Sequence, residues 1–153
     1  TAYRRQRQMC IRDRYAEVIH TLQNRMMEKI GQRGIAIECN PSSNQLIGAF
    51  GAYRDHPVFR FNHTMLPLEQ YSDQPGQLRV SINTDDLGVF DTSIENEFAL
   101  IYSALQQDTD EDGRQKIGDQ QICAYLEQLR EMGHEMTFPK AELTSRKREN
   151  LRR

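Results

Sequence analysis

Apolar residues recur at helical spacing over the first part of the chain. Between residues 15 and 30 they stand three or four positions apart, at Tyr15, Val18, Ile19, Leu22, Met26 and Ile30. Gly34 follows as a stop signal. The spacing predicts an amphipathic helix with its apolar face toward a core.

Two short segments have the pattern of strands. Residues 35–39 are largely apolar and lie between Gly34 and Pro41, which is typical of a buried parallel strand. Residues 79–83 alternate, with Val80 and Ile82 on one face, so this strand is expected to pack on one side.

Helical patterns return after the second strand. Thr92 and Glu95 predict a capping box, followed on one face by Ile94, Phe98, Ile101 and Leu105. A further helix is expected to pack through Ile122, Tyr125, Leu126, Leu129 and Met132, ahead of Gly133.

The long connection from 41 to 76 holds Phe50, Tyr53, Phe59, Phe61 and Tyr71, and loops of this length often shape a pocket. Strands alternating with helices predict the α/β class.

Composition excludes few functions. The 153 residues are 37% hydrophobic and 27% charged with a net charge of −2, which gives no general basic excess for nucleic acid. No apolar run of membrane length and no signal peptide is visible, so we expect a cytoplasmic protein without a membrane partner. Cys10, Cys39 and Cys123 are too few and too widely spaced to predict a disulfide framework.

Adjacent carboxylates, Asp85 and Asp86, follow the second strand directly. Two carboxylates so close repel each other unless a cation or hydrogen-bond donors hold them. The residues alone leave two interpretations open. One is a solvated turn that also starts a helix, and the other is a site organised around a positive partner.

The run 81–90, Ser-Ile-Asn-Thr-Asp-Asp-Leu-Gly-Val-Phe, resembles the final-strand signature of the adenosine deaminase family, zinc hydrolases built on a (β/α)8 barrel. The run 40–44, Asn-Pro-Ser-Ser-Asn, is similar to the loop after the preceding strand, where the family more often has Cys-Pro; the cysteine here is Cys39. The resemblance implies that Asp85 is a zinc ligand and that Asp86 accepts a hydrogen bond from the purine ring. Three residues of the first loop also fit the family's spacing and are candidates for a pocket loop: Ser43, Asn44 and Gly48.

Length limits how much of such a barrel this chain can form. A (β/α)8 barrel needs at least about 200 residues, so we expect the last two or three β/α units of an incomplete TIM barrel, with extra C-terminal helices. The family's other zinc ligands are histidines on earlier strands, and the four histidines here are isolated and predicted to be surface or packing residues: His20, His56, His63 and His134. We therefore expect residues 15–145 to be the C-terminal part of a deaminase that converts adenosine or a related adenine nucleoside to inosine with zinc, and to be inactive alone.

The two ends of the chain have their own patterns. Residues 9–14, Met-Cys-Ile-Arg-Asp-Arg, are what the mosaic end of a transposase sequencing adapter encodes in one frame. Residues 1–14 are therefore expected to be an assembly artefact, or alternatively a natural disordered basic arm. Residues 146–153 are expected to form a basic helical tail.

Other functions remain as alternatives. Residues 108–113, Asp-Thr-Asp-Glu-Asp-Gly, match the first half of an EF-hand calcium loop, although Gln115 and Asp119 do not fit the second half. The alternatives are a non-catalytic interaction or calcium-binding fragment, and an enzyme acting on AMP or another amidohydrolase substrate. The expected small-molecule partner is a purine nucleoside substrate. The chain is also expected to associate with other protein chains, in a homo-oligomer or a larger assembly.

Overall fold

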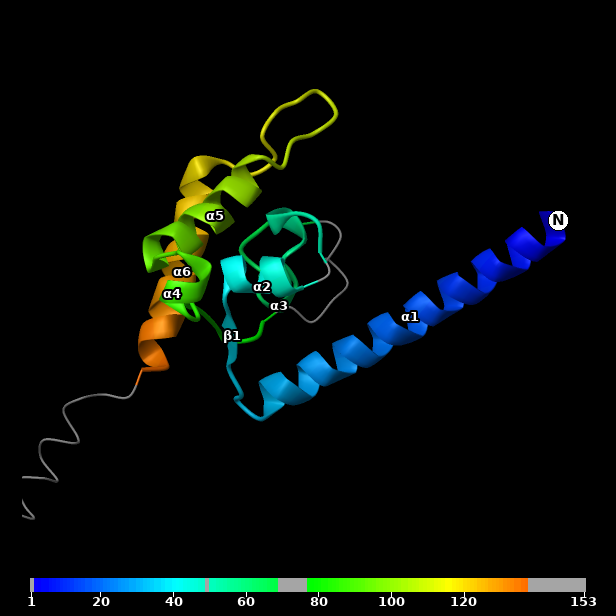
Figure 1. Ribbon diagram of the computed structural model, residues 1–153, viewed down its shortest axis with the longest axis horizontal. Coiled ribbons are helices and arrows are strands. Elements are labelled where there is room, and N and C mark those ends of the chain that lie inside the picture. Colours follow the sequence, from blue (N-terminus) through cyan, green and yellow to red (C-terminus); the bar gives the residue numbers. More distant parts are fainter. Residues whose placement is uncertain (1, 49, 69–76, 138–153) are drawn as a thin grey trace, which may run out of the picture.

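A computed structural model describes residues 2–48, 50–68 and 77–137 of the chain, shown in Figure 1. The elements alternate between helix and strand, as the α/β prediction requires. In chain order they are α1 (Ala2–Gln32), β1 (Ile37–Cys39), α2 (Pro41–Ile47), the 3₁₀ helix η1 (Tyr53–Asp55), α3 (Val58–Phe61), β2 (Val80–Ile82), α4 (Leu87–Phe90), α5 (Ile94–Gln106) and α6 (Asp119–Glu135).

Both predicted strands form, each shorter than its pattern, and they pair in parallel. Ile37 lies opposite Val80, and Cys39 lies opposite Ile82. The alternation in β2 is confirmed, because Val80 and Ile82 are buried while Ser81 between them is half-buried. A parallel pair brings the carboxyl ends of both strands to one edge of the sheet.

The core lies where the strand pair meets α5 and α6. The α6 helix contributes fully buried Ile122, Tyr125 and Leu129, and α5 contributes Ile101 and Leu105. The Tyr125 hydroxyl donates a 2.9 Å hydrogen bond to the backbone oxygen of Asn62, so this aromatic residue is buried without leaving its polar atom unpaired. The packing role predicted for α6 is confirmed, and the helix continues past Gly133 to Glu135.

The α1 helix forms, but the prediction that its apolar face meets the core is wrong for most of its length. Tyr15, Val18, Ile19, Leu22 and Met26 are all exposed. The helix instead touches the rest of the molecule through a neighbouring face near its C-terminal end, where Met27 is buried and Ile30 is partly buried. Figure 1 shows the remainder of α1 running away from the other elements.

The segment expected to be an artefact or a disordered arm continues the same helix back to Ala2. Arg, Gln, Met and Ala have high helix propensity, and residues 2–14 contain neither Gly nor Pro, so nothing in this segment stops the helix. The predicted basic tail at 146–153 lies outside the described residues.

The start of α5 differs from the predicted capping box. Ser93 is the N-cap, and its hydroxyl oxygen accepts a hydrogen bond from the Asn96 backbone N–H at 3.3 Å. The Thr92 hydroxyl donates instead to the carboxylate of Glu97, at 2.5 Å. The helix therefore begins one residue later than the capping box predicted, because the Thr92 hydroxyl bonds to the buried Glu97 carboxylate and does not cap the helix.

The long connection between the strands is partly helical. Its described parts form α2, η1 and α3. Pro41 is the first residue of α2, a position whose backbone N–H has no partner within the helix, so the missing N–H of proline costs nothing. Tyr71 lies among the residues that the structure does not describe. Within the described ranges, no helix is both long and apolar enough to cross a membrane.

Candidate functional site

The two motifs of the sequence analysis meet at the carboxyl ends of the paired strands. The Ser43 hydroxyl, in the first turn of α2, donates a 2.8 Å hydrogen bond to Oδ2 of Asp85, which follows β2. Ser43 is buried and Asp85 is exposed. The bond holds Oδ2 of Asp85 against α2, and Oδ1 makes no hydrogen bond within the described residues.

Asp85 has a left-handed backbone conformation, with φ of 58°. Residues other than glycine rarely adopt this region, although aspartate tolerates it better than most. Backbone conformations of this kind persist where the surrounding structure fixes them, and they cluster at functional sites. Here the Ser43 contact on one side and the start of α4 on the other hold the turn in place.

Asp86 caps α4. Its Oδ1 accepts hydrogen bonds from the backbone N–H groups of Gly88, at 2.9 Å, and Val89, at 3.1 Å. The interpretation of this doublet as the start of a helix is therefore correct for Asp86. Asp86 is exposed, and its second oxygen, Oδ2, makes no hydrogen bond within the described residues.

A buried acid that the sequence analysis missed anchors the start of α2. Glu97 is fully buried, and its Oε2 accepts the Ser42 backbone N–H at 2.8 Å while Oε1 accepts the Thr92 hydroxyl. This satisfies one of the N–H groups that the first turn of a helix leaves without an intrahelical partner. The signal was present in the sequence, because Glu97 stands on the same helical face as Ile94 and Ile101.

Asn44 turns inward toward a buried histidine. Its Oδ1 lies 3.1 Å from Nε2 of His56, while Nδ1 of His56 accepts the Val58 backbone N–H at 3.1 Å. Because Nδ1 is an acceptor, the ring proton is on Nε2 and is donated to Asn44. Burial lowers the pKa of His56 to about 4, partly opposed by the negative charge of Glu97, so the ring is neutral near pH 7.

Gly48 closes α2. Its N–H donates to the backbone oxygen of Asn44 at 2.7 Å, and a Cβ at this position would overlap that oxygen and crowd the Phe50 ring. Gly48, Asn44 and Ser43 therefore hold α2 against its neighbours. Of the three, Ser43 alone bonds to Asp85.

Zinc sites need about four ligands in tetrahedral geometry. Within the described ranges, no group of three or more His, Cys, Asp or Glu side chains is placed to hold a metal ion. Cys39 is buried, and burial raises the pKa of its thiol to about 12, so it is not a thiolate near pH 7. The described residues do not complete a zinc site by themselves.

Acidic side chains in the loop between α5 and α6 bond to other groups of the same loop. Asp110 Oδ1 accepts the backbone N–H groups of Asp112 and Arg114, and Asp108 forms a 2.9 Å ion pair with Lys116. The aspartates that matched a calcium loop are thus used by the turn itself.

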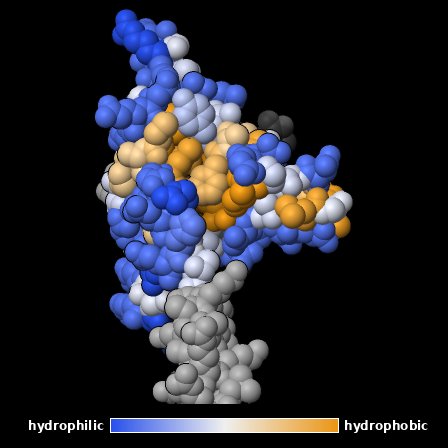
Figure 2. All heavy atoms as spheres, turned by 90° about the vertical axis from the view of Figure 1, so that its left-hand side faces the viewer, coloured by the Kyte–Doolittle hydropathy of each residue, from blue (hydrophilic) through white to orange (hydrophobic). Residues whose placement is uncertain are grey.

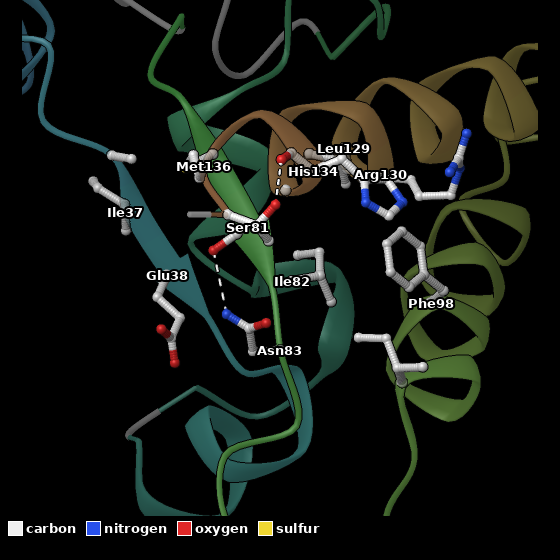
Figure 3. A pocket seen from close by; sticks show the side chains of 14 residues that line it. Ile37, Glu38, Ser81, Ile82, Asn83, Phe98, Leu129, Arg130, His134 and Met136 are labelled. Carbon is white, nitrogen blue, oxygen red and sulfur yellow. Dashed lines mark hydrogen bonds between the residues drawn. The ribbon is translucent and has the colours of Figure 1, made fainter. Parts of the chain in front are cut away.

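A cleft of about 470 Å³ lies between the strand pair, the start of α5 and the end of α6, as Figure 3 shows. Its lining combines apolar Ile82 and Phe98 with polar Glu38, Asn83 and His134. Figure 2 shows an apolar patch bordered by polar atoms on one face of the molecule. Neither Asp85 nor Asp86 lines this cleft, so the strand-end carboxylates and the cleft are separate features.

The chain is an α/β protein with a parallel strand pair. The polar side chains of Ser43 and Asp85 lie just past the carboxyl ends of these strands, which is the usual position of active sites in this class. The adenosine deaminase family model matches residues 10–120, which is most of the chain. The chain belongs to the adenosine deaminase family and carries a deaminase-like hydrolase domain. No curated protein and no solved structure matches it.

Proposed function

We propose that this chain is the C-terminal part of a zinc-dependent deaminase that hydrolyses adenosine or a related adenine nucleoside to inosine and ammonia. The observation that carries the proposal is the Ser43 to Asp85 hydrogen bond, because it joins the two motifs that resemble the family at one strand-end site. The family match over residues 10–120 supports the same assignment.

Each aspartate has a distinct role in this proposal. Asp85 supplies one oxygen ligand to the zinc ion through Oδ1, since Oδ2 is held by Ser43. Asp86 accepts a hydrogen bond from the purine ring through Oδ2, since Oδ1 caps α4. The two carboxylates divide metal binding and substrate binding because each has one oxygen committed to the protein.

The chain alone is expected to lack activity. One carboxylate oxygen does not make a zinc site, and the two described strands are a small part of an eight-stranded barrel. The remaining ligands and strands belong, in this proposal, to a longer parent protein of which residues 15–145 form the C-terminal part.

The test begins with the genomic reading frame upstream of the codon for Tyr15. The longer protein is purified and assayed for inosine formation and zinc content, beside its Asp85→Ala variant and a Glu111→Ala control in the exposed loop between α5 and α6. The variant is expected to lose turnover and bound zinc, while the control keeps both. Unchanged turnover in Asp85→Ala would overturn the assignment.

A further inference from the structure

Alternate residues of β2 direct their backbone polar groups away from β1. In the parallel ladder, the Asn83 N–H donates to the backbone oxygen of Cys39 at 3.0 Å. Successive residues of a strand direct these groups to opposite edges, so Ser81 and Asn83 face β1 while Val80 and Ile82 face the other side. We call the backbone of Val80 and Ile82 the free edge of β2.

The free edge of β2 is buried and unpaired. Val80 is fully buried and Ile82 is 5% exposed. Within the described residues, no hydrogen bond reaches the backbone N–H or C=O of either one. Roughly 90% or more of buried backbone groups in native proteins are paired, because an unpaired one costs free energy. Donors and acceptors that repeat at every second residue match another extended backbone, so they indicate a strand as the partner.

Space for such a strand lies beside the free edge. The cleft of about 470 Å³ is lined by Ile82 from β2, by Ile94 and Phe98 from α5 and by Leu129 from α6. Figure 3 shows β1 on one side of β2 and α5 on the other, with the Ile82 and Phe98 side chains between β2 and α5. Ile94 is apolar and yet 40% exposed. The cleft therefore has apolar walls that a further strand can cover.

The two faces of the strand pair specify the side chains of that strand. Cys39, Val80 and Ile82 share one face and are buried in the core with α5 and α6, whereas Glu38 and Ser81 share the other face. Side chains alternate along a strand. The partner is therefore an extended segment that presents apolar residues toward the helices at every second position and polar residues between them.

We propose that the free edge of β2 binds an extended segment from the part of the longer parent protein that precedes Tyr15, as the next strand of the sheet. This inference rests on the proposed function for the existence of that parent, and it adds the edge, the cleft and the side-chain pattern of the segment. A tethered segment is favoured over a second copy of this chain, because its docking does not cost the translational freedom of a separate molecule.

The first experiment is amide hydrogen exchange, followed by NMR, in this chain and in the longer parent obtained from the reading frame upstream of Tyr15. Relative to the Asn83 amide, the Val80 and Ile82 amides are expected to exchange at least about tenfold more slowly in the parent, because they gain hydrogen bonds there. Asn83 already donates to Cys39 in this chain, so its amide corrects for a general gain in stability.

Three outcomes would overturn the proposal. One is an unchanged relative exchange rate in the parent, and another is a reading frame that supplies no upstream segment. The third is protection of the Val80 and Ile82 amides in this chain alone as its concentration rises, since that would identify a second copy as the partner.

Substitution in the cleft wall gives a second test. Ile94→Asp places a charge in the cleft, and Asn96→Asp, in the same first turn of α5, is the matched control at another exposed position. Both variants should leave the urea midpoint of this chain nearly unchanged. In the parent, Ile94→Asp should lower the midpoint and restore fast exchange at Ile82, while Asn96→Asp should do neither. Equal behaviour of the two variants in the parent would contradict docking in the cleft.

Turnover and zinc content of the same parent separate this proposal from the proposed function. Protected Val80 and Ile82 amides without inosine formation would support the strand and overturn the deaminase assignment. Normal inosine formation with unprotected amides would support the assignment and overturn the strand.

Discussion

The backbone N–H of Ser42 donates a 2.8 Å hydrogen bond to the buried carboxylate of Glu97, which ties the first turn of α2 to α5. The two residues that follow Ser42 make equally specific contacts. Ser43 holds Asp85 after β2, and Asn44 holds His56 after η1. Three consecutive residues thus connect α2 to three other parts of the fold, and one of these contacts holds the Asp85 carboxylate.

Replacing Glu97 by Gln should lower the free energy of unfolding by about 1–3 kcal/mol. Both carboxylate oxygens accept hydrogen bonds in a fully buried setting, and an amide can replace only one of them while turning N–H donors toward the other. Denaturant unfolding measures the change. Glu131→Gln, at an exposed acid of α6, is the matched control and should stay close to wild type. Equal effects at both positions would contradict the anchoring role of Glu97.

Replacing Ser43 by Ala removes the hydroxyl that holds Asp85 and should destabilise the chain by about 1 kcal/mol. Ser103→Ala, at an exposed position of α5, should cost less. The more specific readout is the backbone amide of Asp85 by NMR. Its chemical shift should change in Ser43→Ala and remain unchanged in Ser103→Ala, because the left-handed turn at Asp85 loses its side-chain contact. An unchanged chemical shift in both variants would rule out Ser43 as a positioning residue.

The sequence predicted well what depends on local pattern. Both strands, the position of Asp85 and Asp86 just past β2, and the packing of α6 through Ile122 and Leu129 follow from periodicity over a few residues. Parallel pairing followed from the buried, apolar character of the strands, and it brings Ser43 and Asp85 to the same edge.

Features that depend on tertiary contacts were harder to predict. The apolar pattern on α1 is compatible with packing against the core of this chain or against another surface. Only the fold shows that Tyr15, Val18 and Leu22 stay exposed. Thr92 suited a capping box, but its hydroxyl donates to the Glu97 carboxylate. The position of Glu97 on the apolar face of α5 indicated its burial, whereas its contacts with Thr92 and Ser42 depend on the tertiary fold. The contact between Asn44 and His56 likewise depends on tertiary structure, because it forms only when the chain turns back through η1 and brings His56 beside α2.

His56 should make stability depend on pH. Burial lowers its pKa to about 4 in the folded chain, against an unfolded value of about 6.5, so the unfolded state binds the proton more tightly. The stabilisation is complete above about pH 6.5, is lost as the pH falls toward 4, and amounts to as much as about 3 kcal/mol. Urea unfolding across this range should show the slope in wild type and a smaller slope in His56→Gln. His20→Gln, at an exposed position, should retain the wild-type slope; its loss there would assign the effect to another group.

Gly48 and Gly51 form a matched pair for testing the end of α2. A Cβ at Gly48 would overlap the backbone oxygen of Asn44, whereas a Cβ at Gly51 meets nothing within 4 Å. Gly48→Ala should therefore lower the free energy of unfolding by about 1–3 kcal/mol, and Gly51→Ala should be neutral or slightly stabilising by up to about 1 kcal/mol. Thermal unfolding of the two variants measures the difference. Equal melting temperatures would show that α2 can end without a glycine at 48.

The two functions assigned to Asp86 can be separated by comparing Asn and Ala at this position. Asparagine caps helices about as well as aspartate, so Asp86→Asn should keep α4 and the wild-type stability, while Asp86→Ala should lose about 1 kcal/mol. In the longer parent enzyme that we propose, both variants should keep zinc, because the proposal gives the ligand role to Asp85. Both should lose substrate binding, because each removes the charged acceptor that the proposal places at Oδ2. The expected signature is a raised KM for Asp86→Asn with unchanged zinc content and unchanged unfolding. If Asp86→Asn instead releases zinc, the roles of the two aspartates are reversed; if it keeps a normal KM, Asp86 serves α4 alone.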